Sequence, residues 1–211
     1  HSVSPNVRGI AWDGDGARMF IATSSCEVYE VNTDDGQPMH DSPLLEGHSG
    51  EELYGLAVNP IKDVFATVGD DAILRVWDTF EHTVLNTVSL EMAARCCCYH
   101  PEGRRLMVGF GCPKKLSNAQ YDGKWVVLDC EDYQVMHEAR DSQKWLTCAK
   151  FSPSGEFLAV GSMDCKLYVY NVLTGYGLSA IVSQHNAPIC HVDFSEDSAW
   201  IMSNCSGMEL F

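Results

Sequence analysis

Three side chains in the sequence have the types needed for nucleophilic chemistry. The imidazole of His48, the hydroxyl of Thr67 and the carboxylate of Asp71 match the parts of a hydrolase triad. Two further pairs of titratable residues lie close in sequence, His191 with Asp193 and His137 with Glu138. An enzyme needs such groups exposed and converging in one pocket. Whether these groups can converge depends on the elements that carry them.

The elements that carry them are predicted strands, arranged in five similar segments. Each segment has a β-like run that ends in an aromatic or apolar residue, then a turn rich in Pro, Ser, Gly and Asp, then a second apolar run. The equivalent run-ending residues are Trp12, Val58, Tyr99, Phe151 and Phe194. They recur at roughly 40–50-residue intervals, which is typical of the blades of a β-propeller. For such a fold, a surface that binds partners is a stronger expectation than an enzyme active site.

The second segment shows the pattern most clearly. Gly47-His48 precedes the first predicted strand, and Val76-Trp77-Asp78 ends the third. The four strands that we expect in this segment are 53–58, 64–68, 73–78 and 83–88. The segment resembles a WD40 repeat, on the Gly-His pair at its start and the Trp-Asp pair at its end.

The WD40 resemblance implies a structural role for the residues that could have formed a triad. It assigns to His48, Thr67, Asp71 and Trp77 a hydrogen-bond network that links the strands, because buried imidazole, hydroxyl and indole groups each need a partner. A network of this kind leaves no exposed nucleophile. We therefore expect no catalytic residues and no enzyme activity.

The length sets how much of a propeller the chain can hold. WD40 propellers normally close at about seven blades, or roughly 300 residues, and 211 residues hold about five. We predict an all-β, WD40-type β-propeller of about five four-stranded blades that belong to a larger, seven-bladed or tandem propeller, within one domain, 1–211. The predicted blades are 5–44, 45–88, 89–138, 139–182 and an incomplete 183–211. The remaining blades would come from the rest of a parent chain.

Alternation along the strands places several side chains. Residues two apart in a strand share a face, so His191 and Asp193 are expected to be neighbours on a ladder rather than a catalytic pair. By the same rule Cys96 and Cys98 share one face and Cys97 lies on the other, all packing as small hydrophobes.

The ten cysteines include no Cys-x-x-Cys pair, which argues against a zinc cluster. Free thiols in strands fit a reduced, intracellular compartment. We predict neither a metal nor a cofactor.

Charge and hydropathy exclude some classes of partner. The formal net charge is −15, from 14 basic and 29 acidic residues, which argues against binding to nucleic acid or to an anionic membrane. The acidic surface favours either simple solubility or a basic partner. The sequence has no run of about 18 apolar residues and no signal peptide pattern at its start.

The third segment carries the clearest insertion, roughly eight to ten residues within 112–123, where a short turn is expected. Insertions in repeat proteins often lie on the binding face, although a tolerated surface loop is an equally open interpretation. The candidate partner-binding residues, here and in the next segment, are Lys114, Lys115, Tyr121, Lys144 and Trp145. Other residues expected on loops of the same face are Glu51, Glu52, Asp70 and Asp141.

A closer resemblance rests on the run 52–57, which reads ELYGLA and is followed by Asn59-Pro60. It is similar to the ELWGLA signature of the echinoderm microtubule-associated protein-like family, with Tyr54 in the usual Trp place. The runs 7–12 and 151–162 also resemble that family. The resemblance implies a cytoplasmic, cytoskeletal scaffold that associates with microtubules or tubulin. The alternative is a WD40 adaptor that presents substrates in a ubiquitin-ligase or ciliary transport complex.

Overall fold

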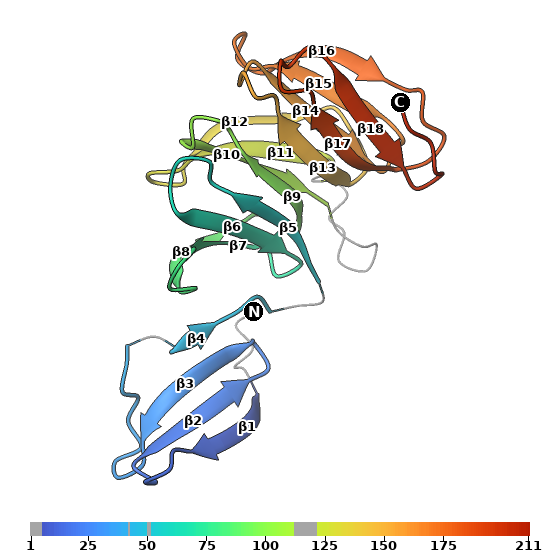
Figure 1. Cartoon of the computed structure of the whole chain (residues 1–211). Helices are drawn as coiled ribbons and strands as arrows, with labels where there is room; N and C mark the ends of the chain where they lie inside the picture. Colours follow the sequence, from blue (N-terminus) through green and yellow to red (C-terminus); the bar gives the residue numbers. More distant parts are fainter. Residues whose placement is uncertain (1–5, 42, 50–51, 112–121) are drawn as a thin grey trace. The chain divides into compact units, whose positions relative to one another are not determined.

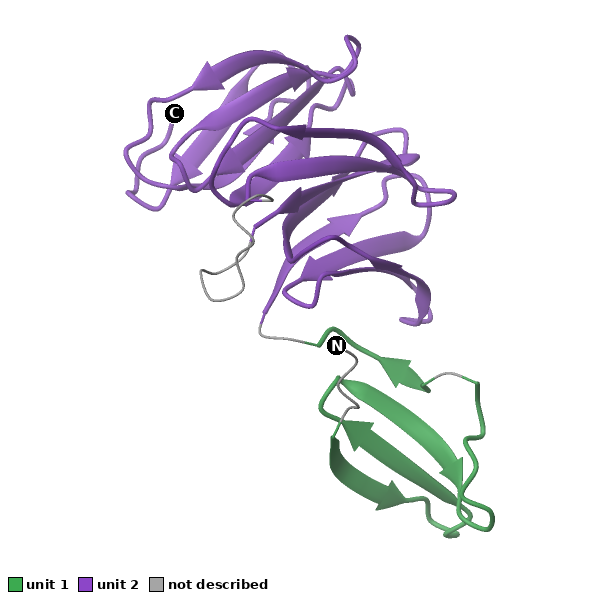
Figure 2. Cartoon of the chain, turned by 180° about the vertical axis from the view of Figure 1, so that it is seen from behind, with its two compact units in different colours: residues 1–51 green, residues 52–211 purple. Residues whose placement is uncertain are grey.

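The computed structural model describes residues 6–41, 43–49, 52–111 and 122–211, which form strands and turns without helices. Within this described part, no helix has the length and apolar character needed to cross a membrane. The chain divides into two compact units, 1–51 and 52–211 (Figure 2). The fold is that of a partial β-propeller, built from antiparallel sheets whose strands follow one another in sequence order (Figure 1).

The first unit is one four-stranded antiparallel sheet. Its strands are β1 (Val7–Trp12), β2 (Arg18–Thr23), β3 (Glu27–Asn32) and β4 (Leu45–Glu46). The short β4 pairs with β3, although the predicted first blade ends at residue 44.

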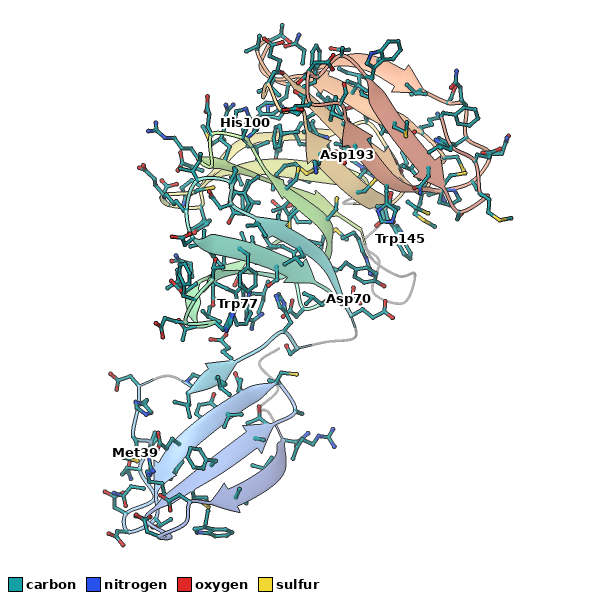
Figure 3. All side chains as sticks on the ribbon, in the orientation of Figure 1. Met39, Asp70, Trp77, His100, Trp145 and Asp193 are labelled. Atoms are coloured by element: carbon teal, nitrogen blue, oxygen red, sulfur yellow. The ribbon has the colours of Figure 1, made fainter. Side chains whose placement is uncertain are left out.

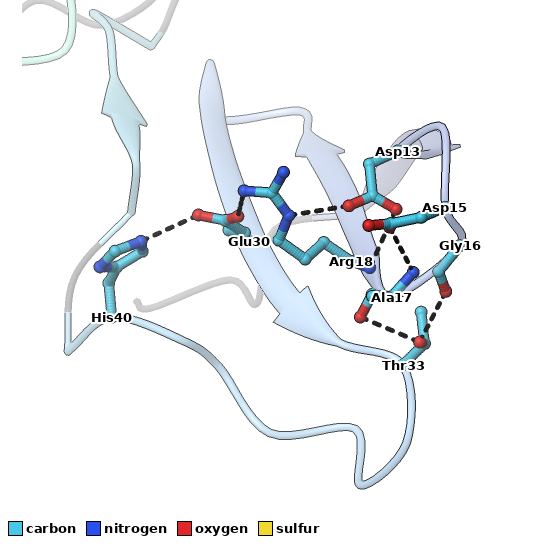
Figure 4. A network of polar contacts seen from close by, with 8 residues as sticks. All are labelled: Asp13, Asp15, Gly16, Ala17, Arg18, Glu30, Thr33 and His40. Carbon is cyan, nitrogen blue, oxygen red and sulfur yellow. Dashed lines mark hydrogen bonds and ion pairs between the residues drawn. The ribbon is translucent and has the colours of Figure 1, made fainter.

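A polar network ties the turns of this sheet together (Figure 4). Arg18 is central, because its guanidinium lies 2.8 Å from a carboxylate oxygen of Asp13 and 3.0 Å from one of Glu30. His40, on the connection to β4, lies 2.9 Å from the other oxygen of Glu30. The hydrogen bond from Arg18 lowers the pKa of Asp13 to about 2. The network thus joins the β1–β2 turn, β3 and the segment that leads to β4.

The second unit contains four further sheets, which follow one another along the chain (Figure 1). Their strands are β5 (Leu53–Val58), β6 (Val64–Gly69), β7 (Ile73–Asp78) and β8 (Val84–Ser89); β9 (Ala94–Tyr99), β10 (Arg105–Phe110), β11 (Lys124–Asp129) and β12 (Val135–Arg140); β13 (Leu146–Phe151), β14 (Phe157–Ser162), β15 (Leu167–Asn171) and β16 (Gly177–Val182); and β17 (Ile189–Phe194) with β18 (Ile201–Cys205).

The first strands of these sheets lie side by side, β5 against β9, β9 against β13 and β13 against β17. In the last sheet, Ser203 and Phe211 exchange backbone hydrogen bonds of 2.8 and 3.0 Å. The chain thus begins to pair along β18 where a third strand is expected.

The predicted blade boundaries after residues 44, 88 and 138 fall one or two residues before the last strand of each sheet ends. The ends of these outer strands are set by backbone pairing with the third strand. Their side chains are largely exposed and give little apolar signal. The assignment of five blades stays a prediction.

The core of the second unit lies between successive sheets. One cluster joins the sheets β5–β8 and β9–β12, a second joins β9–β12 and β13–β16, and a third joins β13–β16 and β17–β18. Cys97 belongs to the first cluster, whereas Cys96 and Cys98 belong to the second. This alternation confirms the predicted faces of β9 and leaves each inner sheet apolar on both sides.

The buried thiols of β9 should be chemically inert in the native chain. Burial raises the pKa of Cys97 to about 12 and holds the pKa of Cys96 and Cys98 well above the usual range, so the reactive thiolate is scarce. Cys26 is exposed. We expect iodoacetamide at about pH 8 to modify Cys26 first and the three β9 cysteines only after unfolding in urea. Timed alkylation followed by peptide mass spectrometry measures this order, and equal native rates would contradict the buried packing.

Candidate functional site

A cavity of about 420 Å³ lies where the first strands of the four sheets begin. It is lined by residues from each of these strands or from the turns beside them, including Tyr54, Arg95, Trp145, Met163 and Ile189. The first strands of a propeller run in the same direction and lie side by side, so their starting residues meet at one end. We call this cavity the Arg95 pocket.

Arg95, on β9, is held from several sides. One terminal nitrogen lies 2.7 Å from a carboxylate oxygen of Asp70, and the side chains of the two residues are only 3% and 2% exposed. Its Nε donates a hydrogen bond of 3.0 Å to the carbonyl of Gly111. The guanidinium carbon lies 3.8 Å from the ring centroid of Tyr54 and 5.0 Å from that of Trp145. Such cation–π contacts fix the plane of the guanidinium.

Asp70 follows the end of β6, which pairs antiparallel with β5, so its carboxylate reaches the same end of the unit as Trp145 (Figure 3). The buried ion pair is neutral as a whole. Neither terminal nitrogen of Arg95 makes a hydrogen bond to a described residue; Nη2 forms the ion pair with Asp70, and Nη1 has neither kind of contact. Tyr54 donates its hydroxyl hydrogen to the carboxylate of Glu52.

The pocket therefore offers apolar and aromatic walls with one buried, directed cation. A guanidinium group offers five N–H donors and no acceptor, so Arg95 can supply hydrogen bonds and positive charge to a ligand. The arrangement suits binding rather than acid–base chemistry. Sequence reasoning placed Trp145 and Asp70 on this face but missed Arg95, since its neighbours Cys96, Cys97 and Cys98 mark β9 as a core strand.

The residues of the expected WD40 network belong to two units, and three of them, Thr67, Asp71 and Trp77, lie in the second. Trp77 donates its indole hydrogen to Thr67 Oγ1 at 2.7 Å and stacks on Phe65 with 6.0 Å between ring centroids. Asp71 lies 2.9 Å from Arg75, and both side chains are 3% exposed. His48 follows β4 in the first unit. The buried Thr67 hydroxyl accepts the hydrogen bond from the Trp77 indole. We therefore propose that the residues of the expected network have a structural role.

The two titratable pairs lie on strands of different sheets, and none of their residues lines the Arg95 pocket. His191 and Asp193 share the exposed face of β17, and Asp193 lies 3.5 Å from Lys150. His137 packs instead on the ring of Tyr176, with 4.8 Å between centroids, and burial lowers its pKa. Glu138, on the opposite face of β12, is exposed and lies 2.9 Å from Lys124.

A third group, which sequence reasoning missed, lies at the last sheet. The possible ligand atoms of His185, Cys205 and Glu209 are within 4.8 Å of one another. His185 is hydrogen-bonded through Nε2 to Ser203 at 2.8 Å. Glu209 accepts 2.8 and 2.7 Å hydrogen bonds from Asn186, which lower its pKa to about 2. A structural zinc site has four ligands, and this cluster offers three. The hydrogen bonds of His185 and Glu209 already account for the cluster as a set of contacts that holds β18 in place.

The predicted partner-binding residues divide into two sets. Trp145 is half-buried at the Arg95 pocket, and Lys144 beside it is exposed. Lys114, Lys115 and Tyr121 lie outside the described residues. Glu51 also lies outside the described residues. Asp141 accepts a 2.9 Å hydrogen bond from the Tyr170 hydroxyl.

Comparison with known proteins places this architecture in a family. The family model described as the echinoderm microtubule-associated protein second beta-propeller matches residues 53–211, which begins at β5 and includes every sheet that lines the Arg95 pocket. The chain belongs to this family.

Its relatives include echinoderm microtubule-associated protein-like 3 of Homo sapiens, 30% identical over 207 residues. Echinoderm microtubule-associated protein-like 2 of Homo sapiens is 31% identical over the same length. The alignments cover 97% of this chain but only 21% and 29% of the two relatives.

Proposed function

We propose that this chain is part of a non-enzymatic interaction scaffold of the microtubule cytoskeleton in the cytoplasm. The observation that carries the proposal is the match of 53–211 to the second β-propeller of echinoderm microtubule-associated proteins. The relatives are named for association with microtubules. The Arg95 pocket supports a binding role, because its cation is buried, neutralised by Asp70 and set among apolar walls.

Charge shapes how such a scaffold would meet a microtubule. The chain carries a net charge of −15, and tubulin is itself acidic, so their long-range interaction is repulsive. Association must then rest on short-range contacts. Moderate salt screens repulsion over about 10 Å, so binding should hold or strengthen as ionic strength rises from low values.

Co-sedimentation tests the proposal. The chain is mixed with increasing concentrations of polymerised tubulin and centrifuged, and a parallel series without microtubules serves as the control. We expect the pelleted fraction to rise and saturate, and to persist at about 0.1 M salt. A pelleted fraction equal to the control at every concentration would contradict the proposal. Capture of ubiquitin-ligase or ciliary transport subunits without tubulin would favour the adaptor interpretation instead.

A further inference from the structure

We propose that the Arg95 pocket binds an extended peptide segment of a partner protein. An apolar side chain of the segment enters between Trp145 and Met163, and a backbone carbonyl accepts a hydrogen bond from Arg95. The proposal rests on the scaffold role and names the chemistry of what that scaffold holds. Three features of the pocket select this ligand.

The first feature is an unused donor. Arg95 lines the cavity with a side chain only 3% exposed, and its Nη1 lacks a hydrogen-bond partner among the described residues. Buried donors in proteins are nearly always satisfied, so the pocket is built for a ligand that brings an acceptor. The stack on Tyr54 and Trp145 and the bond to Gly111 hold the donor in place before the ligand arrives, which reduces the entropy lost on binding.

The second feature is the charge balance. Asp70 lies 2.7 Å from the Arg95 guanidinium and neutralises it. A ligand carboxylate would face that buried Asp70 and a chain of net charge −15, and a ligand cation would face Arg95. A neutral acceptor avoids both costs. The peptide carbonyl is the acceptor that every partner protein carries.

The third feature is the size and character of the walls. A volume of about 420 Å³ lies within the ordinary range of ligand pockets, roughly 300–1,000 Å³. Leu146 and Ile189 form an apolar floor, each only 1% exposed, while Trp145 and Met163 are accessible at the rim. An aromatic rim above a buried apolar floor is the usual setting of a binding hot spot. A side chain of leucine or phenylalanine type fits it.

Selection from a peptide library tests the proposal without tubulin. A phage-displayed library of linear peptides with random sequence is panned on the full 211-residue chain, and one enriched peptide is synthesised for titration. We expect a consensus with one apolar or aromatic anchor and no charged anchor. Affinity should fall at least tenfold with Trp145→Ala or with Met163→Asp. Trp200→Ala is the matched control, because Trp200 is 75% exposed away from the pocket, and it should leave affinity unchanged.

Each other outcome overturns the proposal. These outcomes are no enrichment over panning on the Met163→Asp variant, a consensus anchored by acidic or basic residues, or equal binding by wild type and both pocket variants. Thermal unfolding of each variant verifies its fold, and Met163 lies at an accessible turn, so its variant keeps the test valid if Trp145→Ala unfolds. Peptide binding without microtubule pelleting would reject the microtubule role alone, and the reverse result would reject this pocket alone.

Discussion

Replacement of Trp125 by alanine is expected to lower the free energy of unfolding by about 3–5 kcal/mol. Trp125 is completely buried on β11 and is the largest fully buried side chain in the described part of the chain. Its ring packs on Tyr170, with centroids 4.7 Å apart, and on Tyr176 at 5.7 Å. These two tyrosines belong to the following sheet or its turn, so the substitution opens a cavity between two sheets. Urea denaturation followed by tryptophan fluorescence and circular dichroism measures the loss.

Trp200→Ala is the control for this prediction. Trp200 is 75% exposed, so its removal should change the free energy of unfolding by less than about 0.5 kcal/mol. If Trp125→Ala cost no more than Trp200→Ala, then the sheets β9–β12 and β13–β16 would not share a packed core.

The buried ion pair gives the second large effect. Asp70→Ala should destabilise the chain by about 3–5 kcal/mol, because it leaves the Arg95 guanidinium buried without its counter-charge. Arg95→Met should destabilise the chain by a similar amount, because it leaves the Asp70 carboxylate buried without its counter-charge. The double variant should lose much less than the sum of the two, because no charge is then stranded. Chemical denaturation of the four proteins completes the cycle.

An exposed pair supplies the comparison. Lys150 and Asp193 lie 3.5 Å apart, but their side chains are 52% and 72% exposed, so Asp193→Asn should cost no more than about 1 kcal/mol. If the double variant lost as much unfolding free energy as Asp70→Ala and Arg95→Met lose together, the result would contradict the ion pair.

The strands could be predicted from the sequence wherever turns and apolar runs are both distinct. In the second sheet, β5 and β7 have the predicted bounds, β6 ends one residue later than predicted, and β8 is shifted by one residue at both ends. The alternation of Cys96, Cys97 and Cys98 was also predictable, because side chains in a strand have a period of two. The bounds of exposed outer strands were less predictable, since backbone pairing sets them.

The Arg95 pocket could not be predicted in the same way. Its residues come from four sheets that are far apart in the sequence, so no local motif contains them. Arg95 stands beside three cysteines and looks like an isolated polar residue in a core strand. Its role depends on Asp70, which an apolar pattern cannot relate to it. Trp145 and Asp70 were expected on this face, Trp145 as a large aromatic residue directly before a strand and Asp70 as a turn residue directly after one.

The order in which the sheets pack has a consequence for biogenesis. Every core cluster of the second unit joins a sheet to the one that precedes it in the chain, so each new sheet can dock on a neighbour that has already left the ribosome. Contacts between successive segments close short loops and favour rapid folding, and domains tend to fold from the N-terminus during synthesis. Until the next sheet emerges, the most recently made sheet exposes the apolar face that the next sheet will cover. At this stage a chaperone has the most exposed surface to protect.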